Sequence, residues 1–172
     1  MSARFAGSRT GVLAAVAALA LAAMSAVAVA AAPGNDARAN AVLIPSADRG
    51  NPHLLPSIDR PLTGNNIGAT LEQGEPTPCG SVGATVWFKV YVPAGKAMEL
   101  NTFGSHYDTV LAVYAETRPN GALQLVDCND DTVDYDSQVF APRVPTGRWY
   151  YIQVGGYDAD EGEFVLNIDR RP

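Results

Sequence analysis

Short apolar stretches separated by turn residues make up most of the chain after residue 66. The clearest, Ala84–Tyr91 (ATVWFKVY), is rich in β-branched and aromatic residues and is followed by Pro93-Ala94-Gly95, so it predicts a strand. Beyond the first thirty residues, no segment repeats apolar residues at the i, i+3, i+4, i+7 spacing of an amphipathic helix. We expect strands at Ile67–Glu72, Ala84–Tyr91, Ala97–Phe103, Thr109–Ala115, Ala122–Val126, Gln138–Ala141, Trp149–Gly155 and Glu163–Ile168. This pattern predicts an all-β sandwich or barrel over residues 67–172.

Alternation within the strands indicates which side chains face the core. The last strand places apolar residues on one face and mostly polar residues on the other, as expected for a strand with one face in water. The stretch Thr109–Ala115 is apolar on both faces, which is typical of a central strand. In the last two strands the residues expected to face inward are Tyr150, Ile152, Val154, Phe164, Leu166 and Ile168.

The first thirty residues have the pattern of a secretory signal peptide. Arg4 and Arg9 precede an unbroken apolar run, Gly11–Ala32, that includes the small-x-small sequence Ala28-Val29-Ala30. We expect cleavage near Ala30 and a secreted protein. The run is close to the roughly 20 residues needed to span a bilayer, so an uncleaved N-terminal membrane anchor is the alternative. In both cases the folded part lies outside the cytoplasm.

Residues 31–66 contain five prolines among scattered Gly, Asn and Asp, a composition that disfavours helix and sheet alike. We interpret them as an extended, Pro-rich lead-in. Within it, Ala39–Ile44 is apolar enough to form one short strand or turn against the domain. The alternative is a disordered spacer.

The charge balance of the mature chain excludes some classes of partner. The whole chain has 12 Lys and Arg against 18 Asp and Glu, and removing residues 1–30 takes away two arginines, which leaves 10 − 18 = −8. Nucleic acid and anionic membrane surfaces need an excess of basic residues, so neither is an expected partner. A cation is compatible with this balance.

Cys79 and Cys128 are the only cysteines, and an exported chain matures in an oxidising compartment, so we expect an intramolecular disulfide. Two buried thiols are the alternative. A zinc site is not expected, because no Cys-x-x-Cys spacing occurs.

An acidic run follows Cys128, in the sequence NDDTVDYD. Carboxylates packed this closely repel one another unless a cation or water screens them, and hard oxygen ligands on a loop suit Ca²⁺. The spacing does not fit an EF-hand, and a solvated acidic loop is the alternative. Asp158, Asp160 and Glu161 are expected to add ligands if the fold brings them to the same end. The residues predicted to bind the ion are Asp108, Asn129, Asp130, Asp131, Asp134 and Asp136.

No enzyme signature is complete in this sequence. Ser105, His106 and Asp108 suggest a Ser/His/Asp relay, but adjacent residues on a strand point to opposite faces. Neither GxSxG nor HExxH occurs, and His53 lies in the lead-in. A glycosidase using two of the carboxylates of Asp108, Asp130, Asp131 or Asp136 is the remaining possibility, and we predict no catalysis.

Several motifs together resemble the bacterial pre-peptidase C-terminal domain, with the N-terminal extension of secreted proteins that begin with an NDxFANA-like motif. They cover nearly the whole mature chain, although Ala37-Arg38 replaces a polar residue and an aromatic one. The matching stretches are NDARANAVLI, GATLEQGEPTPCG, ATVWFKVYVPA, GSHYDTVLAVY, LVDCNDD and YYIQVGGYDADEGEFVLNI.

The resemblance implies a jelly-roll-like β-sandwich of about eight antiparallel strands that is not itself catalytic, and some relatives bind calcium. The leading hypothesis is a secreted binding or accessory module, stabilised by Ca²⁺, that adheres to a protein or polysaccharide surface. The alternative is a carbohydrate-binding or carbohydrate-processing protein that uses Trp87, Trp149, Tyr157 and the acidic end. We expect Trp87 and Trp149 to be buried between the sheets, which would leave Tyr107, Tyr135 or Tyr157 for sugar stacking.

Overall fold

The computed structural model describes residues 30–44, 61–117 and 121–171. The predicted signal peptide, apart from Ala30, lies outside these residues, as do residues 45–60 with His53. In the described part of the chain, no helix is long and apolar enough to cross a membrane. The elements are the 3-10 helix η1 (Arg38–Asn40) and strands β1 (Val42–Leu43), β2 (Leu62–Asn65), β3 (Val82–Val92), β4 (Ala97–Asn101), β5 (Thr109–Glu116), β6 (Leu123–Asn129), β7 (Gln138–Ala141), β8 (Arg148–Tyr157) and β9 (Glu163–Arg171).

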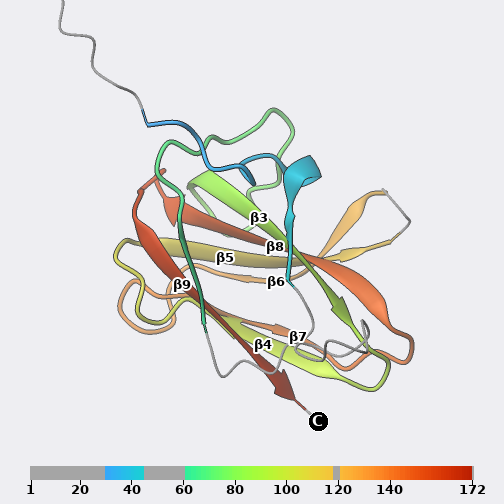
Figure 1. Cartoon of the computed structure of the whole chain (residues 1–172). Helices are drawn as coiled ribbons and strands as arrows, with labels where there is room; N and C mark the ends of the chain where they lie inside the picture. Colours follow the sequence, from blue (N-terminus) through green and yellow to red (C-terminus); the bar gives the residue numbers. More distant parts are fainter. Residues whose placement is uncertain (1–29, 45–60, 118–120, 172) are drawn as a thin grey trace, which may run out of the picture.

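The strands form two facing sheets, as Figure 1 shows. Sheet A has the order β1-β3-β8-β5-β6 and sheet B the order β2-β9-β4-β7. Apart from β1, which runs parallel to β3, all neighbouring strands are antiparallel. From β2 to β9 the chain changes sheet at every step except the β5–β6 hairpin, which gives the two four-stranded sheets of a jelly roll. The predicted jelly-roll-like β-sandwich is confirmed.

The space between the sheets is filled by the alternating inward residues of both. The six residues predicted to face inward on β8 and β9 are all at most 2% exposed and belong to this core. Strand β5 is buried on both faces and lies between β8 and β6, as its two apolar faces predicted. Seven of the eight predicted strands are therefore present, within a residue or a few of their expected bounds.

The lead-in differs from its prediction, because the sandwich begins before residue 67. Strand β2 pairs with β9 over Leu62–Asn65. At Gly64 the sheet accommodates the ring of Phe164, since a Cβ there would lie 2.6 Å from the ring. Val42–Leu43 pairs with β3, so Ala39–Ile44 does contribute the expected short strand against the domain.

The strand predicted at Ile67–Glu72 is absent. Gly68 adopts φ +74° and turns the chain, and Ile67 and Leu71 are 41% and 44% exposed. The segment that follows crosses the outer face of sheet A, where the backbone carbonyl of Thr70 accepts a hydrogen bond from Thr85 N at 3.2 Å. Its apolar residues therefore reflect a covering loop and not a strand.

A second, smaller cluster lies under that loop, on the outer face of sheet A. It contains Trp87 and Tyr114, whose ring centroids are 5.7 Å apart, and Ala112. Trp87 is fully buried, but it lies outside the two sheets and not between them as predicted. Trp149 is on the same outer face and is 36% exposed, so its predicted burial is wrong.

Candidate functional site

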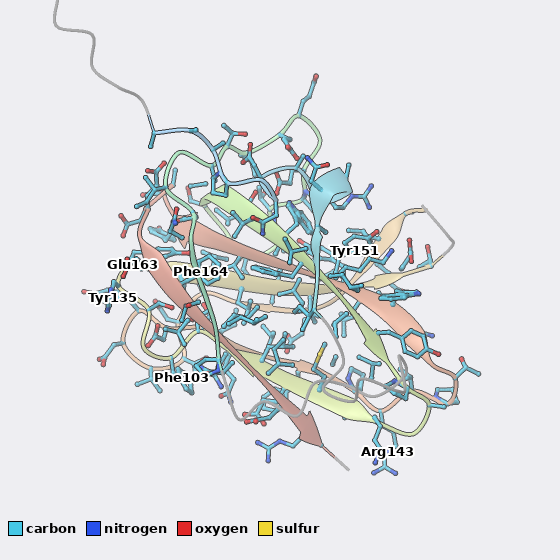
Figure 2. The ribbon with its side chains drawn as sticks, in the orientation of Figure 1. Phe103, Tyr135, Arg143, Tyr151, Glu163 and Phe164 are labelled. Atoms are coloured by element: carbon cyan, nitrogen blue, oxygen red, sulfur yellow. A yellow bond between two sulfur atoms is a disulfide. The ribbon has the colours of Figure 1, made fainter. Side chains whose placement is uncertain are left out.

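One end of the sandwich collects nine of the chain's 18 Asp and Glu residues, and we call it the acidic end. It consists of three loops, those between β4 and β5, between β6 and β7, and between β8 and β9. Antiparallel pairing of β5 with β6 and with β8 brings these loops to the same end of the sandwich. Figure 2 shows Glu163 and Tyr135 at this end and Arg143 at the other. The acidic residues there are Asp108, Asp130, Asp131, Asp134, Asp136, Asp158, Asp160, Glu161 and Glu163.

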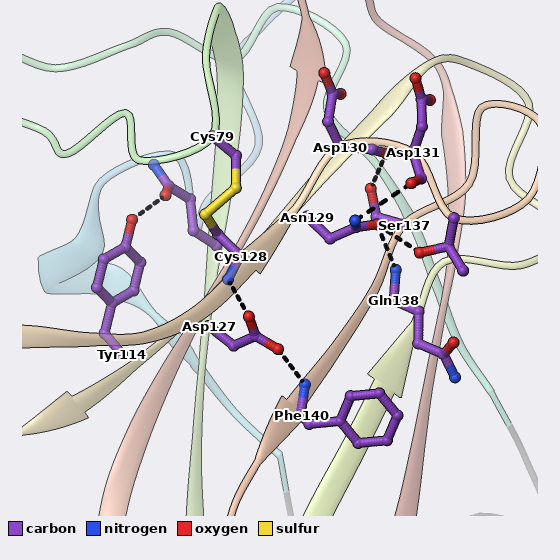
Figure 3. The surroundings of a disulfide bond; sticks show 12 residues. Cys79, Tyr114, Asp127, Cys128, Asn129, Asp130, Asp131, Ser137, Gln138 and Phe140 are labelled. Atoms are coloured by element: carbon purple, nitrogen blue, oxygen red, sulfur yellow. Dashed lines mark hydrogen bonds between the residues drawn. A yellow bond between two sulfur atoms is a disulfide. The ribbon is translucent and has the colours of Figure 1, made fainter.

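Three of the predicted ligands converge at the acidic end. Asp108 immediately precedes β5 and Asp130-Asp131 follow β6, the strand that pairs with it. One carboxylate oxygen from each of the three lies within 4.8 Å of the others. Figure 3 shows Asp130 and Asp131 extending to the same side, next to the strand that carries Cys128.

The carboxylates of this trio are poorly compensated within the described part of the chain. Oδ1 of Asp108 and Oδ1 of Asp130 are buried and have no hydrogen-bond partner there. Desolvation raises the pKa of Asp108, and the charges of Asp130, Asp131, Asp160 and Asp158 raise it further. Desolvation and the charge of Asp131 raise the pKa of Asp130. Two oxygens are thus withdrawn from water and left facing other anions.

A fourth carboxylate, that of Asp160, is held beside the trio. Its Oδ2 accepts a hydrogen bond from the backbone N of Asp108 at 3.2 Å. The fully buried Asn66 fixes this loop, because its Nδ2 donates to the carbonyls of Asp160 (3.0 Å) and Ala84 (2.9 Å) and its Oδ1 accepts from Gly162 N. The condition set for the second acidic turn, that the fold brings it to this end, is met by Asp160, whose carboxylate lies against the backbone of Asp108.

The other predicted ligands shape the loop instead of joining the trio. The Oδ1 atom of Asn129 accepts hydrogen bonds from Thr132 Oγ1 at 2.6 Å and from Gln138 N at 3.1 Å. One carboxylate oxygen of Asp136 accepts from Gly104 N at 3.0 Å. Asp134 is exposed, with φ +52° in the turn. Asp134 and Asp136 are not part of the convergent group, and the side-chain oxygen of Asn129 is occupied by the two hydrogen bonds within the loop.

A buried hydroxyl network lies beneath the trio, and the sequence patterns did not predict it. Ser137 Oγ donates to the carbonyl of Thr109 at 2.6 Å and also contacts the carbonyl of Asp130. Its backbone N donates to Thr102 Oγ1 at 2.8 Å, which in turn lies 2.6 Å from Thr109 Oγ1. Thr102, Thr109 and Ser137 are all fully buried, so they join β4, β5 and the acidic loop in one rigid unit. Isolated Ser and Thr residues give no signal of this kind in a sequence.

A hollow of about 600 Å³ opens beside the trio, and its lining includes Tyr107, Asp108, Asp134, Tyr135 and Asp160. Tyr107 is 7% exposed, and its hydroxyl lacks a hydrogen-bond partner among the described residues. Burial, together with the charge of Asp160, raises the pKa of Tyr107. The hollow is therefore lined by anionic and aromatic groups, which suits a cation more than an anion.

The Ser/His/Asp relay is not assembled in this structure. Ser105 Oγ donates to the carbonyl of Thr102 at 2.6 Å and accepts from Val165 N at 3.0 Å. His106 Nδ1 lies 3.5 Å from Glu163 Oε2, and both side chains are more than 70% exposed. The serine hydroxyl thus has a structural role, and the histidine faces a different carboxylate from Asp108.

The disulfide between Cys79 and Cys128 joins the loop that covers Trp87 to the end of β6, with its Cα atoms 5.9 Å apart (Figure 3). The same loop is held by Glu75. Its Oε1 accepts hydrogen bonds from Trp87 Nε1 at 2.8 Å, from Gln153 Nε2 at 3.0 Å and from the hydroxyl of Thr85. Gln153 Oε1 also accepts from Tyr114 OH at 2.7 Å, so Tyr114 points under the loop.

The three aromatic residues of the carbohydrate hypothesis do not share a surface. Trp87 is fully buried, whereas Trp149 and Tyr157 are 36% and 40% exposed. Trp149 and Tyr157 lie near opposite ends of β8, about 26 Å apart at the usual rise per strand residue. Trp149 therefore belongs to a different surface from the acidic end.

Comparisons with known proteins leave the family open. No family model and no curated protein matches the chain. Among solved structures, the chain is similar to the pre-peptidase C-terminal domain of a collagenase from Bacillus anthracis, with 13% sequence identity and a TM-score of 0.38 over 63% of this chain and 89% of that one. At this TM-score and identity, the likeness assigns neither a family nor a function.

Proposed function

We propose that this protein is an exported, non-catalytic β-sandwich module that binds Ca²⁺ at its acidic end and attaches to a surface outside the cytoplasm. The export rests on the pattern of residues 1–30. The absence of catalysis is supported by Ser105 and His106, whose side chains are engaged with different partners. Calcium would make the acidic end rigid, since oxygen ligands from separate loops would share one ion.

The observation that carries the calcium proposal is the pair of buried, unpaired oxygens on Asp108 and Asp130, beside the carboxylate of Asp131. Buried polar atoms almost always have a partner. For a carboxylate oxygen that partner is either a hydrogen-bond donor or a coordinated cation. Burial and, to a smaller extent, neighbouring carboxylates raise the pKa values of Asp108 and Asp130, so their charged forms are disfavoured, and a bound divalent cation would offset both effects.

The donor set fits calcium better than zinc or copper. It consists of carboxylate oxygens on loops, whereas zinc and copper sites in proteins are built mainly from His and Cys. Asp108, Asp130 and Asp131 would hold the ion. Asp160, tied to the backbone of Asp108, would supply further negative charge nearby.

The test is the melting temperature of the purified protein in excess chelator and in excess Ca²⁺. At 100 times its dissociation constant the ion adds about 2.7 kcal/mol to the free energy of unfolding, which raises the melting temperature by about 5–10 °C for a domain of this size. The variant D108N should lose most of this increase. The control E161Q removes one exposed charge from the same end and should keep it.

Terbium luminescence gives a second readout, because Tyr107 and Tyr135 line the adjacent hollow and can transfer energy to a bound lanthanide. Calcium should displace terbium from the wild type, and D108N should bind terbium at least tenfold more weakly. An identical melting curve in chelator and in calcium, with no tyrosine-sensitised emission, would refute the proposed ion site.

A further inference from the structure

A row of alternating rings and cations crosses the outer face of sheet A. The guanidinium of Arg38 lies 5.7 Å from the ring centroid of Tyr151. The Nζ atom of Lys89 lies 4.5 Å from the centroid of the Tyr151 ring and 5.1 Å from that of the Trp149 ring. The Trp149 ring packs edge-on against the ring of Tyr91, with 5.3 Å between the two centroids. The register explains the row, because β3 and β8 pair Lys89 with Tyr151 and Tyr91 with Trp149.

The row presents positive charge and aromatic surface to solvent. Lys89 pairs with Glu116 at 3.3 Å, but the side chain of Glu116 is 8% exposed and that of Lys89 is 24% exposed. Arg38 is exposed and has no ion pair with any described residue. Trp149 is 36% exposed. The charge offered at this surface is therefore positive, in a mature chain whose net charge is −8 by the count 10 − 18.

The described residues cover only part of this sheet face. Toward the acidic end, Trp87 and Tyr114 are buried under the Glu75 loop and under the N-terminal segment, where Asn35 and the backbone of Trp87 exchange two hydrogen bonds. Lys89 and Trp149 lie beyond that cover, toward the opposite end of β8. The sequence thus places three aromatic residues on a face that the described part of the chain leaves partly open, which is typical of a binding surface.

We propose that this row binds an anionic polysaccharide, that is, a glycan chain carrying carboxylate or sulfate groups. Aromatic faces attract the polarised C–H bonds on the flat face of a sugar ring. An Arg guanidinium can donate two parallel hydrogen bonds to the oxygens of one carboxylate or sulfate group. A cation that lies between two aromatic rings can therefore bind an acidic group while the rings contact the sugar that carries it. A linear row on a sheet suits an extended polymer. The polysaccharide would be the partner in the proposed surface attachment, and its binding does not depend on the calcium site.

The test is the mobility of the purified protein in native gels that contain polygalacturonate, with dextran as the neutral sugar control and polyglutamate as the non-sugar polyanion control. All gels contain chelator, so that calcium cannot bridge the protein and the polymer. Wild type should be retarded by polygalacturonate alone. W149A and R38Q should each weaken the binding, by about tenfold or more for W149A, because a tenfold change corresponds to 1.4 kcal/mol and aromatic anchors usually exceed that.

Two control variants test whether the loss of binding is specific to the row, and not a general effect of removing an aromatic residue or a cation. Y157A removes an aromatic residue of similar exposure to Trp149 from the same strand, at the acidic end. R143Q removes a cation that Figure 2 shows well apart from Tyr151 of the row. Both should bind like wild type, and circular dichroism should show all four variants folded. Retardation by polyglutamate equal to that by polygalacturonate, equal binding by W149A and wild type, or no retardation at all would each overturn the proposal. The calcium measurements above are independent, so either proposal can fail alone.

Discussion

Replacing Glu75 by Ala tests the polar network that fastens the covering loop to sheet A. The carboxylate accepts from Trp87, Gln153 and Thr85 through Oε1 and from Glu72 N at 2.8 Å through Oε2. After the substitution, Gln153 Nε2 keeps the carbonyl of Pro76 at 3.1 Å and Thr85 Oγ1 keeps the carbonyl of Thr70 at 3.2 Å. The indole N–H of the fully buried Trp87, in contrast, loses the acceptor it has in the fold.

The loss of stability in E75A follows from the hydrogen bonds that are lost and those that remain. A buried donor without a partner costs about 1–3 kcal/mol, and a hydrogen bond to a charged group contributes about 1.5–3 kcal/mol. Because Glu75 is partly exposed and water replaces some of these contacts, we expect E75A to lower the free energy of unfolding by about 3 kcal/mol. E75Q keeps an acceptor oxygen and should cost about 1 kcal/mol. Q73A, at an exposed position of the same loop, is the control and should change stability by less than about 0.5 kcal/mol.

Urea unfolding followed by tryptophan fluorescence measures these values, and a double-mutant cycle with W87F isolates the indole contact. W87F removes the N–H, so E75A should cost about 1–2 kcal/mol less in that background. If E75A costs under about 1 kcal/mol, or costs as much in the W87F background as in the wild type, the network does not hold the loop.

Two further predictions concern the disulfide and the pH dependence of stability. The double variant C79S/C128S should lose about 4 kcal/mol in the chain-entropy model for a separation of 49 residues, and a loss below about 1 kcal/mol in thermal unfolding would contradict it. In chelator, burial and neighbouring carboxylates raise the pKa values of Asp108 and Asp130 in the folded state above the ordinary value of 3.8. Their charged forms therefore destabilise the fold at neutral pH, and this destabilisation is relieved as the pH falls toward 3.8. D108N/D130N should therefore be more stable than wild type in chelator at about pH 7, with the difference vanishing near about pH 4, and a pH-independent difference in urea unfolding would refute this sign.

Local patterns in the sequence were sufficient where the polarity of each strand face matches its burial. The alternation in β9 and the two apolar faces of β5 predicted both burial and position, because period-2 patterning reflects the environment of each face directly. The same reasoning failed for Trp87 and Trp149. Their strand contexts are equally apolar, but outward-facing residues can be covered by a distant loop or left open, and local pattern carries no information about that cover.

The candidate site was predictable in composition but not in geometry. Clustered aspartates predicted an acidic end, and strand pairing then brought Asp108 to Asp130 and Asp131. The sequence could not show that Asn129 and Asp136 stabilise the loop while Asp108, Asp130 and Asp131 converge. Asn and Asp side chains suit both roles, because they also accept hydrogen bonds within turns. The start of the sandwich was misplaced for a related reason. The residues of β2 gain their stability from pairing with β9, a strand far away in the sequence.

The separation of charge along the sandwich gives the molecule a permanent electric dipole. Nine carboxylates lie at the acidic end, and Lys96, Arg143, Arg148 and Arg171 lie at strand ends on the opposite side. An interface that carries fixed charge exerts a torque on such a molecule before any contact forms, and this torque fades with salt over a Debye length of about 8 Å. On a negatively charged wall the protein would land with its cationic pole down, so the loops of the acidic end, where we propose that calcium binds, would point away from the wall toward the medium.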